Sequence, residues 1–223
     1  MTSLIYGYGD TGKSFERYLE DKKIDFKIFD SNITEYNLNY NFQDFDKILC
    51  SPGVSKDIFE NIKCQNTNIF TDVDIFFNED RSIKIGITGT NRKSTTAFHL
   101  HQLFNKYKSS NLIGNIGNTM LDYINNGKEF SIIELSSFQL DKMDQNHLDF
   151  GILLNIEEDH LDYHGNFNAY KLAKEKILAA NKSISFETDP YNLFKWITGK
   201  EAKKIQLKNL PYRFEYFSEK IIN

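Results

Sequence analysis

The residues best suited to chemistry stand in one loop between an apolar stretch and an amphipathic one. The loop, Gly86-Ile-Thr-Gly-Thr-Asn-Arg-Lys-Ser-Thr-Thr96, follows the apolar run 83–85 and precedes 97–107, where apolar residues recur every three or four positions. This order predicts a strand, a loop and a helix whose N-terminus and backbone N–H groups face an anion. Lys93 would then reach the outer phosphates of a nucleotide, and Ser94 would ligate Mg²⁺.

Two positions of this loop depart from the usual phosphate-loop pattern. Arg92 stands directly before the lysine, where a glycine is usual, and Ile87 stands six positions before it, where another glycine is expected. A loop this poor in glycine also fits an ordinary strand–helix turn, so that alternative stays open on the loop alone.

A second glycine-rich turn follows the first expected strand, residues 3–6. It reads Gly7-Tyr-Gly-Asp-Thr-Gly12 and matches G-x-G-x-x-G, and the strand 25–29 beyond it is followed by Asp30, 18 positions after Gly12. In dinucleotide sites a carboxylate about 20 residues after the glycines holds a ribose. Taken alone, the pattern predicts a dinucleotide site, and a tight turn without a ligand is the alternative.

Two further expected strands lead into acidic residues. The strand 130–134 ends in Glu134, and an acid at the carboxyl end of a strand beside a phosphate loop is suited to Mg²⁺. A buried strand rarely carries an unpaired glutamate, which favours a functional role for Glu134 over a structural one. The strand 150–155 is followed by a cluster of titratable residues, Glu157, Glu158, Asp159, His160, Asp162 and His164. That cluster lacks the paired Cys or His spacing of a zinc site and the central glycine of an EF-hand loop.

One lysine lies on the apolar face of an expected helix. In 167–180 that face consists, at helical spacing, of Tyr170, Ala173, Lys174, Ile177 and Leu178. A lysine there either serves a function or carries its ammonium group out to solvent, and the periodicity does not separate the two.

Composition excludes several classes of protein. The chain has 223 residues, 40% hydrophobic and 26% charged, as expected of a globular protein with one large or two small domains. A net charge of −4 offers no basic surface for nucleic acid. No apolar run approaches the roughly 20 residues that span a bilayer, and no signal peptide opens the chain. The two cysteines, Cys50 and Cys64, are expected to be reduced cytosolic thiols.

The phosphate loop resembles that of the Mur ligases, Thr-Gly-Thr-Asn-Gly-Lys-Ser/Thr, with Arg92 as its one departure. The segment Glu134-Leu-Ser-Ser-Phe-Gln-Leu140 is similar to one that marks the D-glutamate-adding branch of that family. The segment Asn155-Ile-Glu-Glu-Asp-His-Leu-Asp162, together with Tyr170-x-x-x-Lys174, is similar to the metal and carbamoyl-lysine segment of the same branch. From Leu4 onward, the chain therefore resembles a Mur ligase.

This resemblance implies an α/β protein with a Rossmann-like N-terminal domain and a P-loop-type central domain. We expect residues 1–82 to bind the UDP-substrate and residues 83–208 to bind ATP, with the polar stretch 78–82 as the linker. After Phe186 the resemblance is patchy, and the central domain is expected to be shortened. Residues 209–223 resemble the start of a C-terminal ligase domain, the rest of which would be missing.

The resemblance also implies the site residues. Those for ATP are Gly89, Thr90, Asn91, Lys93, Ser94, Thr95 and Arg213. Those for the UDP-substrate are Gly9, Asp10, Thr11, Gly12, Asp30, Ser51, Pro52, Gly53, Asn115, Ser136 and Gln139. Two Mg²⁺ ions would be held by Ser94, Glu134, His160 and Lys174, the lysine carrying a carbamate formed with CO₂. Lys93, Lys174 and His160 would be the catalytic residues.

The activity implied is ATP-dependent amide ligation in the synthesis of cell-wall peptidoglycan. The carboxylate of UDP-N-acetylmuramoyl-L-alanine would attack the γ-phosphate of ATP, and the amine of D-glutamate would displace phosphate from the acyl phosphate. The resemblance further implies a cytoplasmic monomer without nucleic-acid or membrane partners. Because a C-terminal domain would bring the amine site, we expect this chain alone to bind its substrate without completing the reaction.

Two other functions remain open at this point. A nicotinamide-dependent dehydrogenase could be built on Gly7–Gly12 and Asp30, although it leaves the second half of the chain unexplained. A module that holds a nucleotide or a UDP-sugar without turnover is favoured by Arg92 and by the missing domain.

Overall fold

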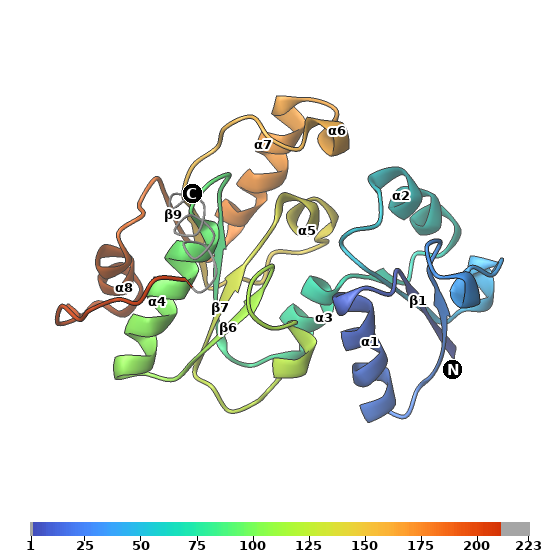
Figure 1. Ribbon diagram of the computed structural model, residues 1–223, viewed down its shortest axis with the longest axis horizontal. Coiled ribbons are helices and arrows are strands. Elements are labelled where there is room, and N and C mark those ends of the chain that lie inside the picture. The colour runs from blue at the N-terminus through green and yellow to red at the C-terminus, as the bar shows by residue number, and fades with distance from the viewer. Residues whose placement is uncertain (1, 211–223) are drawn as a thin grey trace, which may run out of the picture.

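Two parallel β-sheets, each covered by helices, make up the protein. In the computed structural model, which describes residues 2–210, the two sheets lie side by side, and the expected α/β class is confirmed (Figure 1). Every strand pair in this range is parallel, so the carboxyl ends of the strands of each sheet gather at one edge. No helix between residues 2 and 210 is long and apolar enough to cross a membrane.

The first sheet has four strands in the order β2-β1-β3-β4. Its strands are β1 (Thr2–Tyr6), β2 (Asp25–Phe29), β3 (Lys47–Cys50) and β4 (Ile69–Phe70), and its helices are α1 (Asp10–Asp21) and α2 (Lys56–Gln65), with 3₁₀ turns at Thr34–Tyr36 and Phe42–Asp44. Successive residues of a strand point to opposite faces. Leu4 and Ile48 therefore pack with the side chains of α2, whereas Ile5 and Leu49 pack with those of α1.

The second sheet has five strands in the order β6-β7-β5-β8-β9. The strands are β5 (Ile83–Thr88), β6 (Ser110–Gly114), β7 (Phe130–Glu134), β8 (Phe150–Leu153) and β9 (Lys182–Ser185). The helices are α4 (Lys93–Tyr107), α5 (Ser137–Lys142), α6 (Leu161–His164), α7 (Phe167–Glu175) and α8 (Pro190–Thr198), with 3₁₀ turns at Leu121–Tyr123 and Lys176–Ala179.

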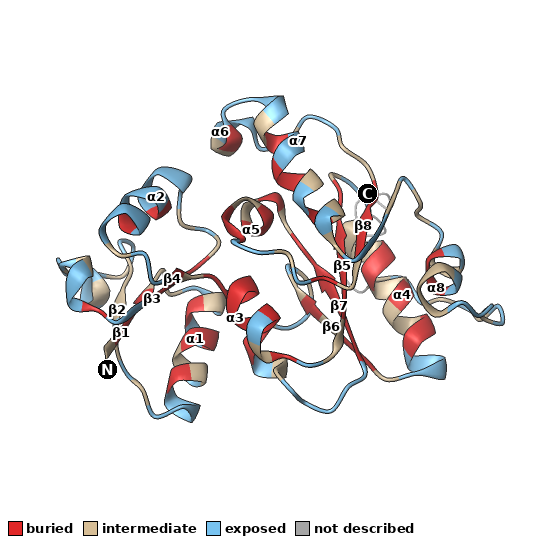
Figure 2. Ribbon diagram, turned by 180° about the vertical axis from the view of Figure 1, so that it is seen from behind, coloured by how far each residue is buried: buried red, intermediate tan, exposed pale blue. Residues whose placement is uncertain are grey.

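Both faces of this second sheet are buried, which is why its inner strands are nearly continuous apolar runs. On one face, Ile85 and Ile132 pack against Leu100 of α4 and Leu193 of α8. The opposite face packs against a second cluster that includes Ile177 of the 3₁₀ turn after α7. Figure 2 shows β5 and β7 buried along most of their length.

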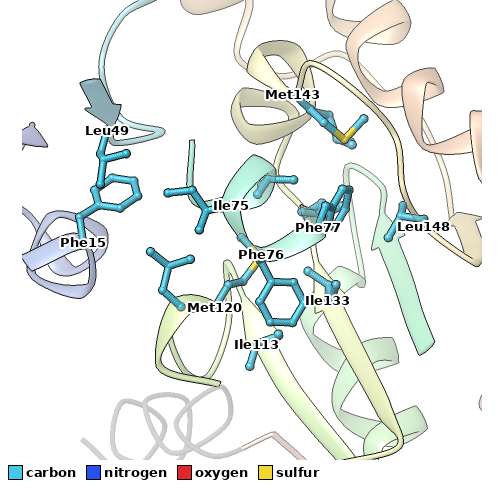
Figure 3. Close-up of a cluster of buried hydrophobic side chains, with 14 of the residues drawn as sticks. Phe15, Leu49, Ile75, Phe76, Phe77, Ile113, Met120, Ile133, Met143 and Leu148 are labelled. Atoms are coloured by element: carbon cyan, nitrogen blue, oxygen red, sulfur yellow. The ribbon is translucent and has the colours of Figure 1, made fainter. Parts of the chain in front are cut away.

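Helix α3 (Asp72–Glu79) joins the two halves through a shared hydrophobic core. The Thr71 hydroxyl accepts from the Asp74 N–H (3.3 Å), and the Asp74 carboxylate accepts from the Thr71 N–H (2.8 Å), so a reciprocal cap starts the helix. One cluster of buried side chains runs from Phe15 of α1, through Phe76 of α3, to Ile133 of β7 (Figure 3). The relative placement of the two sheets is therefore set by packing.

The connection between the sheets is shorter and more firmly held than the expected linker 78–82. Helix α3 continues to Glu79, so only residues 80–82 lead into β5. The buried Lys84 ammonium donates to the main-chain oxygens of Asp80 (2.6 Å) and Ser82 (3.3 Å), and Asn125 N donates to the Asp80 carboxylate (2.8 Å). These bonds pair polar groups of the segment that the sequence predicted to be a linker.

Three expected elements differ in detail from the structure. Helix α4 begins at Lys93, four residues before the expected start at 97. The segment 111–117, which resembles a loop of the family, begins within the edge strand β6, so its residues 111–114 are extended. The expected helix 167–180 is α7 followed by a 3₁₀ turn. There the chain crosses β8 at Gly151, where a Cβ would overlap the main-chain oxygen of Ile177. The tightened last turn lets the two backbones touch.

The glycine-rich turn Gly7–Gly12 provides a test of how closely the backbone packs. A Cβ at Gly12 would overlap the main-chain oxygen of Gly7, whereas one at Gly9 would meet nothing within 4 Å. We expect Gly12→Ala to lower the free energy of unfolding by about 2 kcal/mol, because α1 must move off the turn. Gly9→Ala, the matched control, should change it by less than about 1 kcal/mol. Urea unfolding measures both, and equal stabilities would contradict the close approach.

Candidate functional site

The phosphate loop joins β5 to α4 and is fastened to the chain that follows β8. Thr90 N donates to the main-chain oxygen of Asn155 (3.1 Å), and Asn91 N donates to the side-chain oxygen of Asn155 (2.7 Å). The Asn155 amide nitrogen donates back to the main-chain oxygen of Asn91 (3.1 Å). These bonds give the loop a defined shape within the protein itself.

Arg92 closes this loop in a left-handed conformation, with φ 65° and ψ 5°, as the residue before α4. Glycine occupies this region at little cost, whereas a residue with a Cβ costs roughly 1–2 kcal/mol more. The Arg92 side chain is exposed. Arginine thus adopts the backbone shape that the usual glycine provides, and α4 keeps its place directly after the loop.

The first turn of α4 holds the residues expected to contact phosphates. Lys93 is half-buried, and its Nζ donates to the main-chain oxygen of Thr90 across the loop (2.9 Å). Ser94 and Thr95 are half-buried beside it. No acidic residue stands in this turn, so an anion here would meet the positive end of the helix dipole without repulsion from the turn itself.

Lys174 lies beneath the same loop. It is 1% exposed, and its Nζ donates to the main-chain oxygen of Gly89 at 2.8 Å and lies 3.4 Å from the Thr88 hydroxyl. The Tyr170 ring centroid is 4.9 Å from the ammonium. Burial, together with the nearby charge of Lys93, lowers the pKa of Lys174 to about 7. The lysine of the apolar helix face is therefore buried and does not reach solvent.

Glu134 ends β7 at the same edge of the sheet. It is 1% exposed, and its Oε1 accepts from the side-chain amide of Asn115 (3.2 Å). Its Oε2 is buried without a hydrogen-bond partner. A buried carboxylate oxygen without a partner is costly, and a bound cation is one way to satisfy it. The donor chemistry at Glu134 therefore fits Mg²⁺.

His160 lies at the rim and not in the buried part of the site. It is exposed, has a left-handed backbone (φ 51°), and its Nε2 lies 3.5 Å from an Asp159 carboxylate oxygen. Its ring centroid is 4.8 Å from that of Phe138 and 6.4 Å from that of Tyr170. Among residues 2–210, no three His, Cys, Asp or Glu side chains form a group that could hold a metal ion. Any Mg²⁺ here would need further oxygen ligands, such as phosphate oxygens or water.

A cavity of about 420 Å³ opens at the carboxyl edge of the first sheet. Its lining includes Gly9, Asp10, Thr11, Asp30, Ser51, Pro52, Gly53, Val54 and Ser55, with the rings of Tyr6, Tyr8 and Phe29. Gly7 turns the chain there with φ +89°, and the Ser51 hydroxyl donates to its main-chain oxygen (2.7 Å). The structure thus gathers the residues expected to hold a UDP-substrate around one cavity, except for Gly12 and the three from the second sheet.

Asp30 has bonds to the protein backbone. One of its carboxylate oxygens accepts from Tyr8 N (2.7 Å), and the other accepts from Asn32 N (2.8 Å). The carboxylate therefore fixes the glycine-rich turn against the end of β2. This contact is a structural role that the spacing of the motif does not reveal.

Ser136 and Gln139 form the capping box of α5. The Gln139 side-chain oxygen accepts from Ser136 N (3.1 Å) and from the Ser136 hydroxyl (3.0 Å). Its amide nitrogen lies 3.4 Å from a carboxylate oxygen of Asp72. Gln139, expected among the substrate residues, is 4% exposed and serves to start the helix.

Two polar residues that the sequence did not single out lie where the two halves meet. Asp72 is 4% exposed, burial raises its pKa to about 6, and its Oδ1 has no partner. Lys142, at the end of α5, reaches the loop that lines the cavity. Both look like ordinary polar helix residues in the sequence, and only the packing of the two halves buries them. Arg213, expected to face ATP, lies outside the described residues.

Comparison with known proteins gives one family. The family model described as the Mur ligase middle domain matches residues 87–210, more than half of the chain. The UDP-N-acetylmuramoylalanine–D-glutamate ligase of Francisella tularensis subsp. tularensis is 35% identical over 202 residues, which are 86% of this chain and 47% of that protein. The same ligase of subsp. novicida is 36% identical over 180 residues, 77% of this chain and 42% of that protein. The chain spans about half the length of the curated relatives it matches.

A solved structure agrees on the fold. The UDP-N-acetylmuramate:L-alanyl-γ-D-glutamyl-meso-diaminopimelate ligase of Neisseria meningitides is similar with a TM-score of 0.50 and 15% identity, over 79% of this chain and 67% of that one. The expected pair of α/β units is therefore confirmed together with the family match. The chain belongs to the Mur ligase family.

Proposed function

We propose that this chain is the UDP-substrate- and ATP-binding part of a ligase that adds D-glutamate to UDP-N-acetylmuramoyl-L-alanine in the cytoplasm. One observation carries the proposal: the buried ammonium of Lys174 lies 2.8 Å from the main-chain oxygen of Gly89 in the phosphate loop. The similarity to D-glutamate ligases, over about half of their length, supports the choice of substrate.

The edge of the second sheet suits a nucleoside triphosphate. Lys93 would contact the outer phosphates, whose charge the N-terminus of α4 also favours. Ser94 and Glu134 would hold one Mg²⁺, since the unpartnered Oε2 of Glu134 supplies a hard oxygen donor. When bound, the ion would offset the charge that gathers as a carboxylate approaches a triphosphate.

Lys174 would act after modification by CO₂. A neutral amine adds to the carbon of CO₂ and loses a proton, which gives a carbamate and turns a buried cation into an anion. The lowered pKa leaves a large share of Lys174 neutral near pH 7, as this addition requires. The carbamate and His160 would hold the second ion, at the boundary between the buried site and its rim.

The cavity of the first sheet would take the uridine nucleotide. Gly9 leaves open space beside the first turn of α1, so a diphosphate can approach the backbone and the positive end of that helix. The aromatic side chains of Tyr8 and Phe29 line the same cavity and offer surfaces for the nucleoside. The cavity therefore offers separate places to the charged and the flat parts of one ligand.

The proposed reaction joins the UDP-substrate at the carboxyl edge of the first sheet with ATP at that of the second. The L-alanyl carboxylate attacks the γ-phosphorus of ATP, ADP leaves, and an acyl phosphate forms. The amine of D-glutamate then attacks the acyl carbon, phosphate leaves, and the nitrogen loses a proton. The residues of this chain orient the carboxylate and the triphosphate and balance their charge.

Ligand binding separates this proposal from a dehydrogenase. Both carboxylate oxygens of Asp30 already accept backbone N–H groups, which leaves fewer sites for a ribose. We expect isothermal titration calorimetry to detect binding of UDP-N-acetylmuramoyl-L-alanine and none of NADH. Binding of NADH without binding of the uridine nucleotide would contradict the assignment. A module without turnover would bind the substrate yet show no D-glutamate-dependent ADP release.

The carbamate can be detected directly. We expect protein equilibrated with ¹³C-labelled bicarbonate near pH 8 to give a carbamate carbonyl signal in its ¹³C spectrum. Lys174→Met should remove that signal, whereas Lys171→Met, the control on the exposed face of α7, should retain it. A signal that survives Lys174→Met would assign the carbamate to another amine.

Arg92 can be tested against the glycine that relatives of this loop usually carry. Because Lys93, Ser94 and the helix N-terminus are unchanged, we expect Arg92→Gly to alter the ATP dissociation constant by tenfold or less, about 1.4 kcal/mol. Lys93→Ala should weaken ATP binding by more than that. A wild-type chain that binds no ATP, with binding restored by Arg92→Gly, would show that the arginine disables the loop.

A further inference from the structure

The ammonium of Lys142 crosses from the second half of the molecule to the first. Lys142 ends α5 and is 5% exposed, and its Nζ donates to the main-chain oxygens of Pro52 and Val54, each at 2.6 Å. Between residues 2 and 210 no carboxylate lies within ion-pairing distance of this ammonium. Two carbonyls of one loop are therefore its hydrogen-bond acceptors.

Two aromatic rings lie beside the same ammonium. Its Nζ lies 5.9 Å from the Phe59 ring centroid and 5.2 Å from that of Tyr163. Burial lowers the pKa of Lys142 to about 8. Hydrogen bonds to a charged donor are among the stronger ones, and they weigh more where water is excluded. The site is thus built to hold these two carbonyls.

The peptide geometry of the loop links Lys142 to the cavity. In a planar trans peptide the C=O and the following N–H point in opposite directions. When the carbonyls of Pro52 and Val54 point to Lys142, the N–H groups of Gly53 and Ser55 point away from it. Both residues line the cavity, and neither N–H donates to another group among the hydrogen bonds of residues 2–210. Two backbone donors are therefore left for a ligand.

We propose that Lys142 is a positioning residue that holds loop 51–55 from across the molecule and so presents the N–H groups of Gly53 and Ser55 to the diphosphate of the UDP-substrate. This inference rests on the proposed function of the cavity. Helix α5 begins three residues after Glu134, at the end of β7. Lys142, which contacts the loop of the cavity, is therefore connected by one short helix to the strand that would face ATP. Lys142 would then set the two sites in a fixed relation.

The matched control is another lysine at the same boundary. Lys56 at the start of α2 forms an ion pair with Asp141 of α5 (3.0 Å), beside Lys142, but it binds a side chain and no loop carbonyl. Half of its side chain is exposed, and such pairs contribute little. Lys56→Met therefore removes a cross-boundary contact without releasing the loop.

The experiment compares Lys142→Met, Lys142→Arg and Lys56→Met with the wild type. Amide exchange of Val54, whose N–H donates to Ser51 O at 3.2 Å, is followed by NMR without ligand, and the dissociation constants of UDP and ATP are measured by calorimetry. We expect Lys142→Met to speed Val54 exchange at least tenfold and to weaken UDP binding about tenfold, with ATP binding within twofold. Lys142→Arg, which keeps a charged donor, should restore most of the UDP affinity, and Lys56→Met should match the wild type.

Three results would overturn the inference. One is unchanged Val54 exchange and UDP affinity in Lys142→Met. Another is an equal loss of UDP and ATP binding in that variant, which would indicate a general loss of structure. If Lys142→Met does not fold, the Arg variant decides, and a folded Arg variant with UDP binding weakened more than tenfold overturns it. A wild type that binds no UDP refutes the function proposed for the cavity, while Val54 exchange still tests the hold on the loop.

Discussion

The shared core around α3 is the constraint on which the rest of the structure depends. A ligand bound at the edge of the first sheet can react with one bound at the second only if the two edges keep a fixed distance. Phe76, 0% exposed between side chains of both halves, cannot leave this core without opening a large cavity. The ion pair of Arg17 with Asp122 (2.6 Å) follows the same boundary at the surface. Packing would therefore supply the alignment that the proposed reaction needs.

Because the core holds the two halves together, the protein can bury several polar groups that lack a full set of hydrogen bonds. An oxygen of Glu134 and one of Asp72 lack hydrogen-bond partners, and Lys174 is an ammonium under a loop. Each of the two unpartnered oxygens lowers stability by an amount on the order of 1–3 kcal/mol. They lie at the carboxyl ends of parallel strands or in the segments beside them, where ligands of α/β proteins bind. Groups of this kind collect at functional sites because a ligand can satisfy what the fold leaves open.

The sequence predicted several strands well and the polar contacts poorly, for physical reasons. The inner strand 130–134 has the expected bounds because it is a mostly apolar run, and the edge strand 25–29 has them because apolar residues dominate one end of a short segment between turns. The start of α4 was placed four residues late because its first turn is polar, as a phosphate-binding turn must be. Helical periodicity placed Lys174 on the apolar face of its helix but did not decide whether its ammonium is buried or reaches solvent. The burial of Asp72 and Lys142 could not be predicted, because their partners lie 67 and 88–90 positions away in the chain.

The segment 134–140, by which the chain resembles the D-glutamate-adding branch of the family, also starts helix α5. Ser136 and Gln139 are spaced as a capping box, and their side chains bond to each other, so the motif fixes where α5 begins. The helix is only six residues long, and its direction therefore depends strongly on that cap. Lys142 stands at its far end, and its ammonium contacts the loop 51–55 that lines the cavity of the first sheet. A change at Gln139 would disturb the cap, then the helix direction, and then the hold on that loop, so lost substrate binding after such a change does not by itself place Gln139 against the substrate.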